Sequence, residues 1–87
     1  MILKADGFDG AILGLGRRCG QPDLLVYDVD KCVGILMKDG MTEEEAMEYF
    51  EFNVVGAWMG EGTPIFLYRG VEDIELSKKE YTLINTL

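Results

Sequence analysis

The sequence predicts an α+β fold in which a small sheet of about three strands packs against an αα-hairpin. Two amphipathic stretches with helical spacing follow one another between residues 28 and 60, and an Asp-Gly turn separates them. Short apolar runs bounded by Gly and Pro lie before and after them, as is typical of buried strands. We expect the last two strands to be antiparallel, because two intervening helices return the chain to the far end of the sheet, where the preceding strand ended.

Three segments are expected to form the strands. The first, 11–15, lies in the glycine-punctuated stretch DGFDGAILGLGRRCG, and a helical turn is the alternative there. The second, 24–27, is a continuous apolar run after the chain break at Gln21-Pro22-Asp23. The third, 65–68, opens after Pro64, which suits the first position of a strand or an edge strand.

The first helix is expected to begin after Asp28, a residue type that caps helix N-termini. Its apolar positions recur at helical spacing, at Val29, Cys32, Val33 and Leu36. Lys38 falls in the last turn, where a cation interacts favourably with the helix dipole. Gly40 follows and can adopt the left-handed conformation common just beyond a helix end.

The second helix is expected within 41–60, where Thr42 and Glu45 have the spacing of a capping box. One polar residue, Asn53, lies on its apolar face. The residues of this face, which follow helical spacing, are Ala46, Tyr49, Phe50, Asn53, Val54 and Ala57. We expect Asn53 to be buried and therefore hydrogen-bonded inside the fold or across an interface. Two interpretations stay open, a structural amide that fixes helix register and a pocket residue near Trp58 and Glu61. Trp58 itself is expected in the core or at a subunit interface.

The chain of 87 residues is expected to be one small domain, with 70–87 as an appended tail. Ser77 and Glu80 repeat the capping-box spacing and predict a short C-terminal helix, with a β-hairpin turning at 77–80 as the alternative. A domain of this size is near the lower limit for a self-sufficient core. We therefore expect a homo-oligomer.

The charge balance is strongly acidic, with 16 Asp and Glu against 8 Lys and Arg and a net charge of −8. Binding to nucleic acid or to anionic lipid is therefore not expected, because both need a basic surface. Residues 39–68 contain acidic but no basic side chains. These carboxylates either solvate the outer face of the second helix or meet a basic protein partner through Glu43, Glu44, Glu48 and Glu51.

The sequence predicts a cytoplasmic protein. Its first residues, MILKADGFDG, lack the basic and apolar regions of a signal peptide. No apolar run approaches the roughly 18 residues that a membrane span needs. The two cysteines, Cys19 and Cys32, are then expected to be reduced.

The candidate chemistry is sparse. The chain has no histidine, which excludes cysteine–histidine and serine–histidine catalysis within it. Cys19 stands beside two arginines, which favour the thiolate, and a structural thiol is the alternative. No acidic spacing matches a metal-binding loop, and the glycine spacing from Gly14 to Gly20 does not match a nucleotide-binding loop. We assign no catalytic residue, no metal and no cofactor.

Arg17 and Arg18 form the densest positive charge in this acidic chain. Arginine binds carboxylates and phosphates in bidentate fashion, so the pair predicts an anion-binding pocket that also contains Asn53 and Glu61. The composition favours the alternative, an ion pair between an arginine and one of the many carboxylates of the chain.

Four segments of the chain resemble a family of small uncharacterised proteins from bacteria and their phages. The resemblance covers about residues 6–66 and is carried by DGFDGAILGLGRRCG, VYDVDKC, LMKDGMTEEEAMEYFEFNVVGAW and GEGTPIF. Residues from Gly70 onward lie outside it. The family has no assigned activity, so the resemblance implies a bacterial or phage-infected setting and implies no catalytic residue.

Three functional hypotheses follow. The first is a small interaction protein that self-associates and acts by binding a macromolecular partner. If the resemblance to the bacterial and phage family holds, a phage could encode it. The second is a binder of a small anionic ligand through Arg17 and Arg18. The third is a small enzyme using Cys19 or a pair of carboxylates. The absence of any recognisable catalytic spacing favours a non-enzymatic role.

Overall fold

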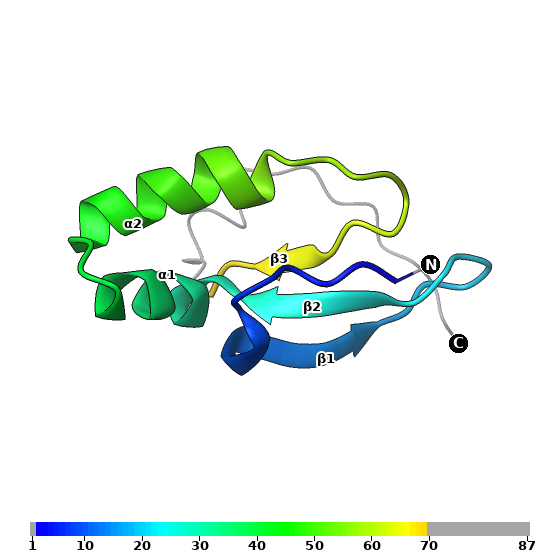
Figure 1. The fold of residues 1–87 in the computed structure, drawn as a ribbon. Coiled ribbons are helices and arrows are strands. Elements are labelled where there is room, and N and C mark those ends of the chain that lie inside the picture. The colour runs from blue at the N-terminus through cyan, green and yellow to red at the C-terminus, as the bar shows by residue number, and fades with distance from the viewer. Residues whose placement is uncertain (1, 70–87) are drawn as a thin grey trace, which may run out of the picture.

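The structure is a computed structural model that describes residues 2–69. In chain order these residues form the following elements: a 3₁₀ turn (Asp9–Ala11), β1 (Ile12–Gly16), β2 (Leu24–Asp28), α1 (Val29–Lys38), α2 (Glu43–Phe50), a π-helical turn (Glu51–Val55) and β3 (Ile65–Leu67) (Figure 1). The predicted α+β class is confirmed, since the two helices pack against a three-stranded sheet. The C-terminal helix or hairpin predicted at 76–81 lies outside the described residues.

The sheet has the order β1-β2-β3, with β1 antiparallel to β2 and β2 parallel to β3. The prediction that the last two strands are antiparallel is therefore wrong. β2 ends at Asp28 and α1 begins at the next residue, so no loop is present in which the chain could reverse. Figure 1 shows that α1 continues outward from the end of β2 and that only α2 runs back along the sheet. The connection 56–64 then turns the chain again, and Ile65 pairs beside Val26.

α1 forms as the sequence predicts. The Asp28 carboxylate caps its N-terminus by accepting a hydrogen bond from the backbone N–H of Asp30 at 3.0 Å. Gly40, just past its C-terminus, has a φ of +106°, which a side chain would disfavour. Its apolar face is buried, and burial together with the charge of Asp28 raises the pKa of the Cys32 thiol to about 11. Cys32 is therefore a protonated, structural thiol at neutral pH.

α2 begins with the predicted capping box. The Glu45 backbone N–H donates to Thr42 Oγ1 at 3.1 Å, and the Thr42 backbone N–H donates to Glu45 Oε1 at 2.9 Å. The hydrogen bond from the Thr42 backbone, followed by the interaction with the Thr42 side chain, holds the pKa of the Glu45 carboxyl below its usual range. The helix is shorter than predicted, because α-helical geometry ends at Phe50 and the π-helical turn carries the chain only to Val55.

The predicted burial of Asn53 is wrong. Its side chain is exposed, and its Nδ2 donates to the Tyr49 backbone carbonyl at 3.1 Å. The row Ala46, Phe50 and Val54 faces the core together with Val55, and Ala46 and Phe50 are fully buried. A π-helical turn has more residues than an α-helical one, so it shifts Asn53 away from the face that α-helical spacing predicts.

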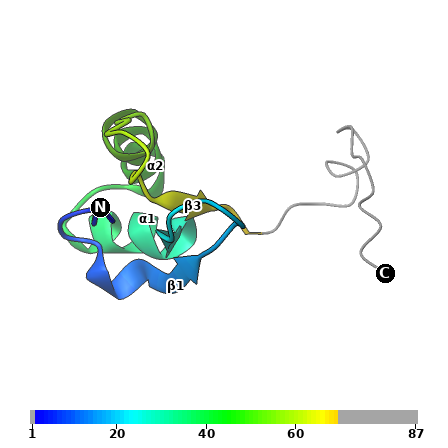
Figure 2. The same ribbon diagram turned by 90° about the vertical axis from the view of Figure 1, so that its right-hand side faces the viewer.

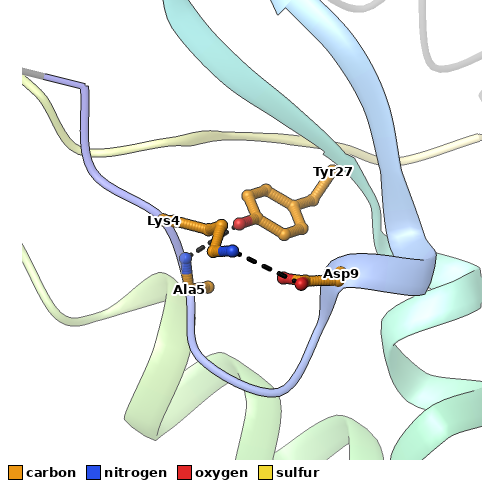
Figure 3. Close-up of polar contacts among 4 residues, drawn as sticks. All are labelled: Lys4, Ala5, Asp9 and Tyr27. Atoms are coloured by element: carbon orange, nitrogen blue, oxygen red, sulfur yellow. Dashed lines mark hydrogen bonds and ion pairs between the residues drawn. The ribbon is translucent and has the colours of Figure 1, made fainter.

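An aromatic cluster joins the elements of the core. The Phe50 ring lies edge-on to Phe8 and to Phe66, with centroids 5.8 and 5.5 Å apart, and Phe66 lies 5.8 Å from Tyr27. Figure 2 shows α2 end-on beside β3. The Tyr27 hydroxyl also accepts a hydrogen bond from the Ala5 backbone N–H at 2.8 Å (Figure 3). The cluster thus connects the N-terminal segment, β2, β3 and α2.

Two polar contacts hold the residues that follow β3. Arg69 Nε donates to Asp28 Oδ2 at 2.7 Å, and the Tyr68 hydroxyl donates to Glu51 Oε1 at 2.8 Å. Burial and the neighbouring Glu51 raise the pKa of Tyr68 to about 12. Burial alone would raise the pKa of Asp28, but the hydrogen bond and charge of Arg69, with two backbone N–H groups, hold it below its usual range.

Replacing Phe50 by alanine is expected to destabilise the fold by about 3–5 kcal/mol, because the ring is fully buried between two others. The matched control is Phe52→Ala, two residues further along, where the ring is 78% exposed. That change is expected to alter stability by no more than about 0.5 kcal/mol. The urea unfolding midpoints of the two variants measure these changes in stability. An equal decrease in stability for Phe50→Ala and Phe52→Ala would contradict the packing of Phe50 described above.

Asp28 is expected to make stability depend on pH. Its pKa is lower in the folded chain than in the unfolded one, so its ionised form stabilises the fold above the ordinary value of 3.8. This contribution is lost as the pH falls through the folded value. Asp28→Asn keeps a capping side chain but loses the charge, so its deficit in urea midpoint should be larger at pH 7 than at pH 2. The control is Asp6→Asn at an exposed carboxylate, and an Asp28→Asn deficit that does not change with pH would contradict the account.

Candidate binding cleft

A cleft of about 590 Å³ opens at the end of the sheet where β1 stops and β2 and β3 start. Its floor is apolar and comes from Leu24 and Ile65, with Pro22 beside them. The loop 17–23 between β1 and β2 forms one wall, and the connection 56–64 forms the other. The two loops come together only because β3 runs parallel to β2 and starts at the same end of the sheet.

Gly16, at the floor of the cleft, leaves room for the side chains of Val26 and Ile65. A Cβ atom at this position would lie 3.0 Å from Val26 Cγ2 and 3.3 Å from Ile65 Cδ1. Contacts this short would force the neighbouring side chains to move. The missing side chain at residue 16 therefore lets Ile65 lie close to the backbone of β1.

The cleft continues onto the outer face of the sheet, defined here as Leu24, Val26, Ile65 and Leu67. Side chains alternate along a strand, so these residues point away from Tyr27 and Phe66, which belong to the core. Ile65 and Leu67 are 43% and 41% exposed. Within residues 2–69, none of the four packs against the core cluster.

The wall formed by the connection 56–64 presents Trp58 and Glu61. Thr63 shapes this turn, because its Oγ1 accepts a hydrogen bond from the Met59 backbone N–H at 2.8 Å and donates to the Gly60 carbonyl at 2.7 Å. The indole of Trp58 is 72% exposed, so the expectation that it is a core residue of this chain is wrong. Short local hydrogen bonds therefore hold a large aromatic side chain at the surface.

The opposite wall carries Arg17 and Arg18. Arg17 is already engaged, since its Nε and Nη2 donate to the two carboxylate oxygens of Asp23, each at 2.8 Å. This pair lowers the pKa of Asp23 and raises that of Arg17, chiefly through the side-chain hydrogen bond. Among the described residues, neither Arg18 nor Glu61 forms an ion pair.

Three of the four residues predicted for the ligand pocket thus line one cleft, namely Arg17, Arg18 and Glu61. Asn53 does not. It borders a separate groove of about 260 Å³ between the N-terminal segment and the π-helical turn, together with Lys4 and Asp6. For Arg17, the structure shows the predicted alternative, an ion pair with a carboxylate of the chain.

The four residues predicted to face a partner share the outward side of α2 and its π-helical turn. Glu43, Glu44, Glu48 and Glu51 are all exposed and surround the side chain of Met47. Of these, Glu51 also accepts the hydrogen bond from Tyr68. Their role in binding a partner stays a prediction.

Other chemistry has less support. Cys19 is an exposed free thiol in the loop 17–23, and it is not among the residues that line the cleft. No three His, Cys, Asp or Glu side chains within residues 2–69 come together in a way that could hold a metal ion. Nor does any helix in this part of the chain have the length and apolar character to cross a membrane.

The outer face of the sheet was not predicted from the sequence, and Asp23 was not singled out as the carboxylate that pairs with Arg17. The first had a signal, because Leu24, Leu25 and Val26 are all apolar and so place apolar side chains on both faces of β2. The second had none beyond proximity, since several carboxylates lie within reach of Arg17 in the sequence.

Comparison of the chain with protein-family models, with curated proteins and with solved structures found no match. The resemblance to the bacterial and phage family described above stays a prediction. The function is therefore argued from the cleft and its surroundings.

Proposed function

We propose that this chain is a small interaction protein that binds a protein partner through the outer face of the sheet and the adjoining cleft. One observation carries the proposal. From Leu24 to Tyr27, β2 is apolar on both faces, a pattern typical of strands that are covered on both sides, yet the described helices cover only one. Asp28, the last residue of β2, lies on the outer face beside Leu67, where it pairs with Arg69. An apolar surface that continues into an exposed tryptophan is typical of a protein interaction site.

The acidic surface of α2 is the proposed second contact. Its carboxylates would steer a basic partner toward the molecule and add little to affinity, because exposed charges are screened by salt. The proposed setting is the cytoplasm of a bacterium or of a phage-infected host, following the resemblance. Self-association is part of the proposal, since a second copy could also cover an apolar sheet face.

A second candidate is binding of a small anion in the cleft, which the position of Arg17 and Arg18 on one wall favours. The ligand would have to displace Asp23 from Arg17 or use Arg18 alone. Asp23→Asn would release Arg17, so a real anion site should give a larger thermal shift with phosphate in this variant than in the wild type. An equal or absent shift in both would count against the anion site.

The test of the proposed function is partner capture by the full chain and by the double variant Trp58→Ser/Ile65→Ser. The wild type is expected to retain a protein partner. The double variant is expected to capture at least roughly tenfold less of that partner, because tryptophans often contribute most of the binding energy at interfaces. The matched control is Phe52→Ser, which removes a 78% exposed aromatic ring from a different surface and should keep the partner.

Two results would contradict the proposal. One is a partner that the double variant retains. The other is a double variant that loses folding stability instead of binding, since this would mean that the chain itself covers both side chains. A partner lost only after charge reversal at Glu43 and Glu44 would move the contact surface to α2.

A further inference from the structure

The wall of the cleft that carries Trp58 and Glu61 has the two groups that recognise a cationic side chain. An exposed indole face attracts a guanidinium or ammonium group through its quadrupole, and a nearby carboxylate adds an ion pair. Both side chains extend from the same short turn, which Thr63 holds by two hydrogen bonds of 2.8 and 2.7 Å. Within the described residues, Glu61 has no cation of its own.

The rest of the molecule favours a cation at this wall. The net charge of the chain is −8, and residues 39–68, which include α2 and this wall, contain no basic residue. Such a field draws cations toward the surface and repels anions. Arg17 does not oppose the field, because Asp23 neutralises it with two hydrogen bonds of 2.8 Å.

The floor of the cleft fits the remainder of such a side chain. Leu24 and Ile65 provide an apolar surface along which the methylene stem of an arginine or lysine can lie while its charged end reaches the wall. Arg18 lies on the opposite wall and carries only donors. A free cation would be repelled by it, whereas a polypeptide offers backbone carbonyls that Arg18 can bind.

We infer that the cleft binds an arginine or lysine side chain within a basic, extended segment of a partner protein, with Trp58 and Glu61 holding its charge. This inference rests on the proposed function and specifies the chemistry of its partner. It replaces the anionic ligand predicted from Arg17 and Arg18 by a cationic one.

The test uses the intrinsic fluorescence of Trp58, which is the single tryptophan of the chain. The full chain is titrated with three terminally blocked peptides of equal length. They share one leucine and differ only in carrying two arginines, two glutamines or two glutamates. The arginine peptide is expected to give a saturable change and to bind at least roughly tenfold more tightly than the glutamine peptide, with an affinity that falls as salt rises.

Two variants locate the cation. Glu61→Gln should weaken binding of the arginine peptide by about two- to fivefold, in line with the loss of an exposed ion pair. The matched control is Asp39→Asn, which removes one exposed carboxylate at the turn between α1 and α2, at the other end of the molecule, and should leave the affinity unchanged. Circular dichroism verifies that both variants are folded.

The inference is overturned if the glutamine peptide binds as tightly as the arginine peptide, which would leave an apolar contact and the proposed function intact. Tighter binding of the glutamate peptide would overturn it in favour of the anion site at Arg18. If no peptide changes the fluorescence of Trp58, the inference also falls, and partner capture by the double variant decides the proposed function separately.

Discussion

The packing of Phe50 between Phe8 and Phe66 is the constraint on which the rest of the structure depends. β3 has three residues and, in the described part of the chain, hydrogen-bonds only to β2. A strand this short cannot hold its place by backbone hydrogen bonds alone, and it follows a long excursion through both helices whose closure costs entropy. The edge-on contacts of the three rings offset that cost, because they fix β3 to α2 and α2 to the N-terminal segment at once.

Asp28 decides the direction of the chain on the other side of this core. It is the last residue of β2, the N-cap of α1 and the acceptor for Arg69. Because strand passes into helix at this residue without a loop, α1 must continue away from the sheet, and α2 must bring the chain back. The return by one helix makes β3 parallel to β2, and the parallel arrangement places the connection 56–64 beside the loop 17–23. The cleft is therefore a consequence of a strand–helix junction at the other end of the sheet.

The sequence predicts well those features that depend on interactions between residues close together in the chain. The cap at Asp28, the capping box of Thr42 and Glu45, and the glycine at residue 40 each involve residues no more than four apart, so their spacing carries the information. The direction of β3 depended instead on the path of α1, which continues outward from β2 and does not return along the sheet, and a pattern of apolar residues does not reveal that path.

The exposure of Asn53 depended on a change from α- to π-helical geometry after Phe50, which α-helical periodicity cannot anticipate. The candidate site shows the same division between local and distant information. Arg17 and Arg18 are adjacent in the sequence, so their proximity could be predicted. Glu61 and Trp58 line the same cleft only because β3 is parallel to β2, and this could not be predicted from the sequence.

The two faces of β2 explain why the molecule has a binding surface where it does. Tyr27 and Leu25 face the core, and Val26 and Leu24 face the opposite way with no polar residue between them. An antiparallel or mixed sheet with one solvated face normally alternates apolar and polar residues, because exposed apolar side chains bring no benefit to a monomer. The absence of that alternation in β2 is hard to reconcile with folding alone. A surface that stays apolar on the outer face, and acidic on the wall beside it, is consistent with a partner that is itself both apolar and basic.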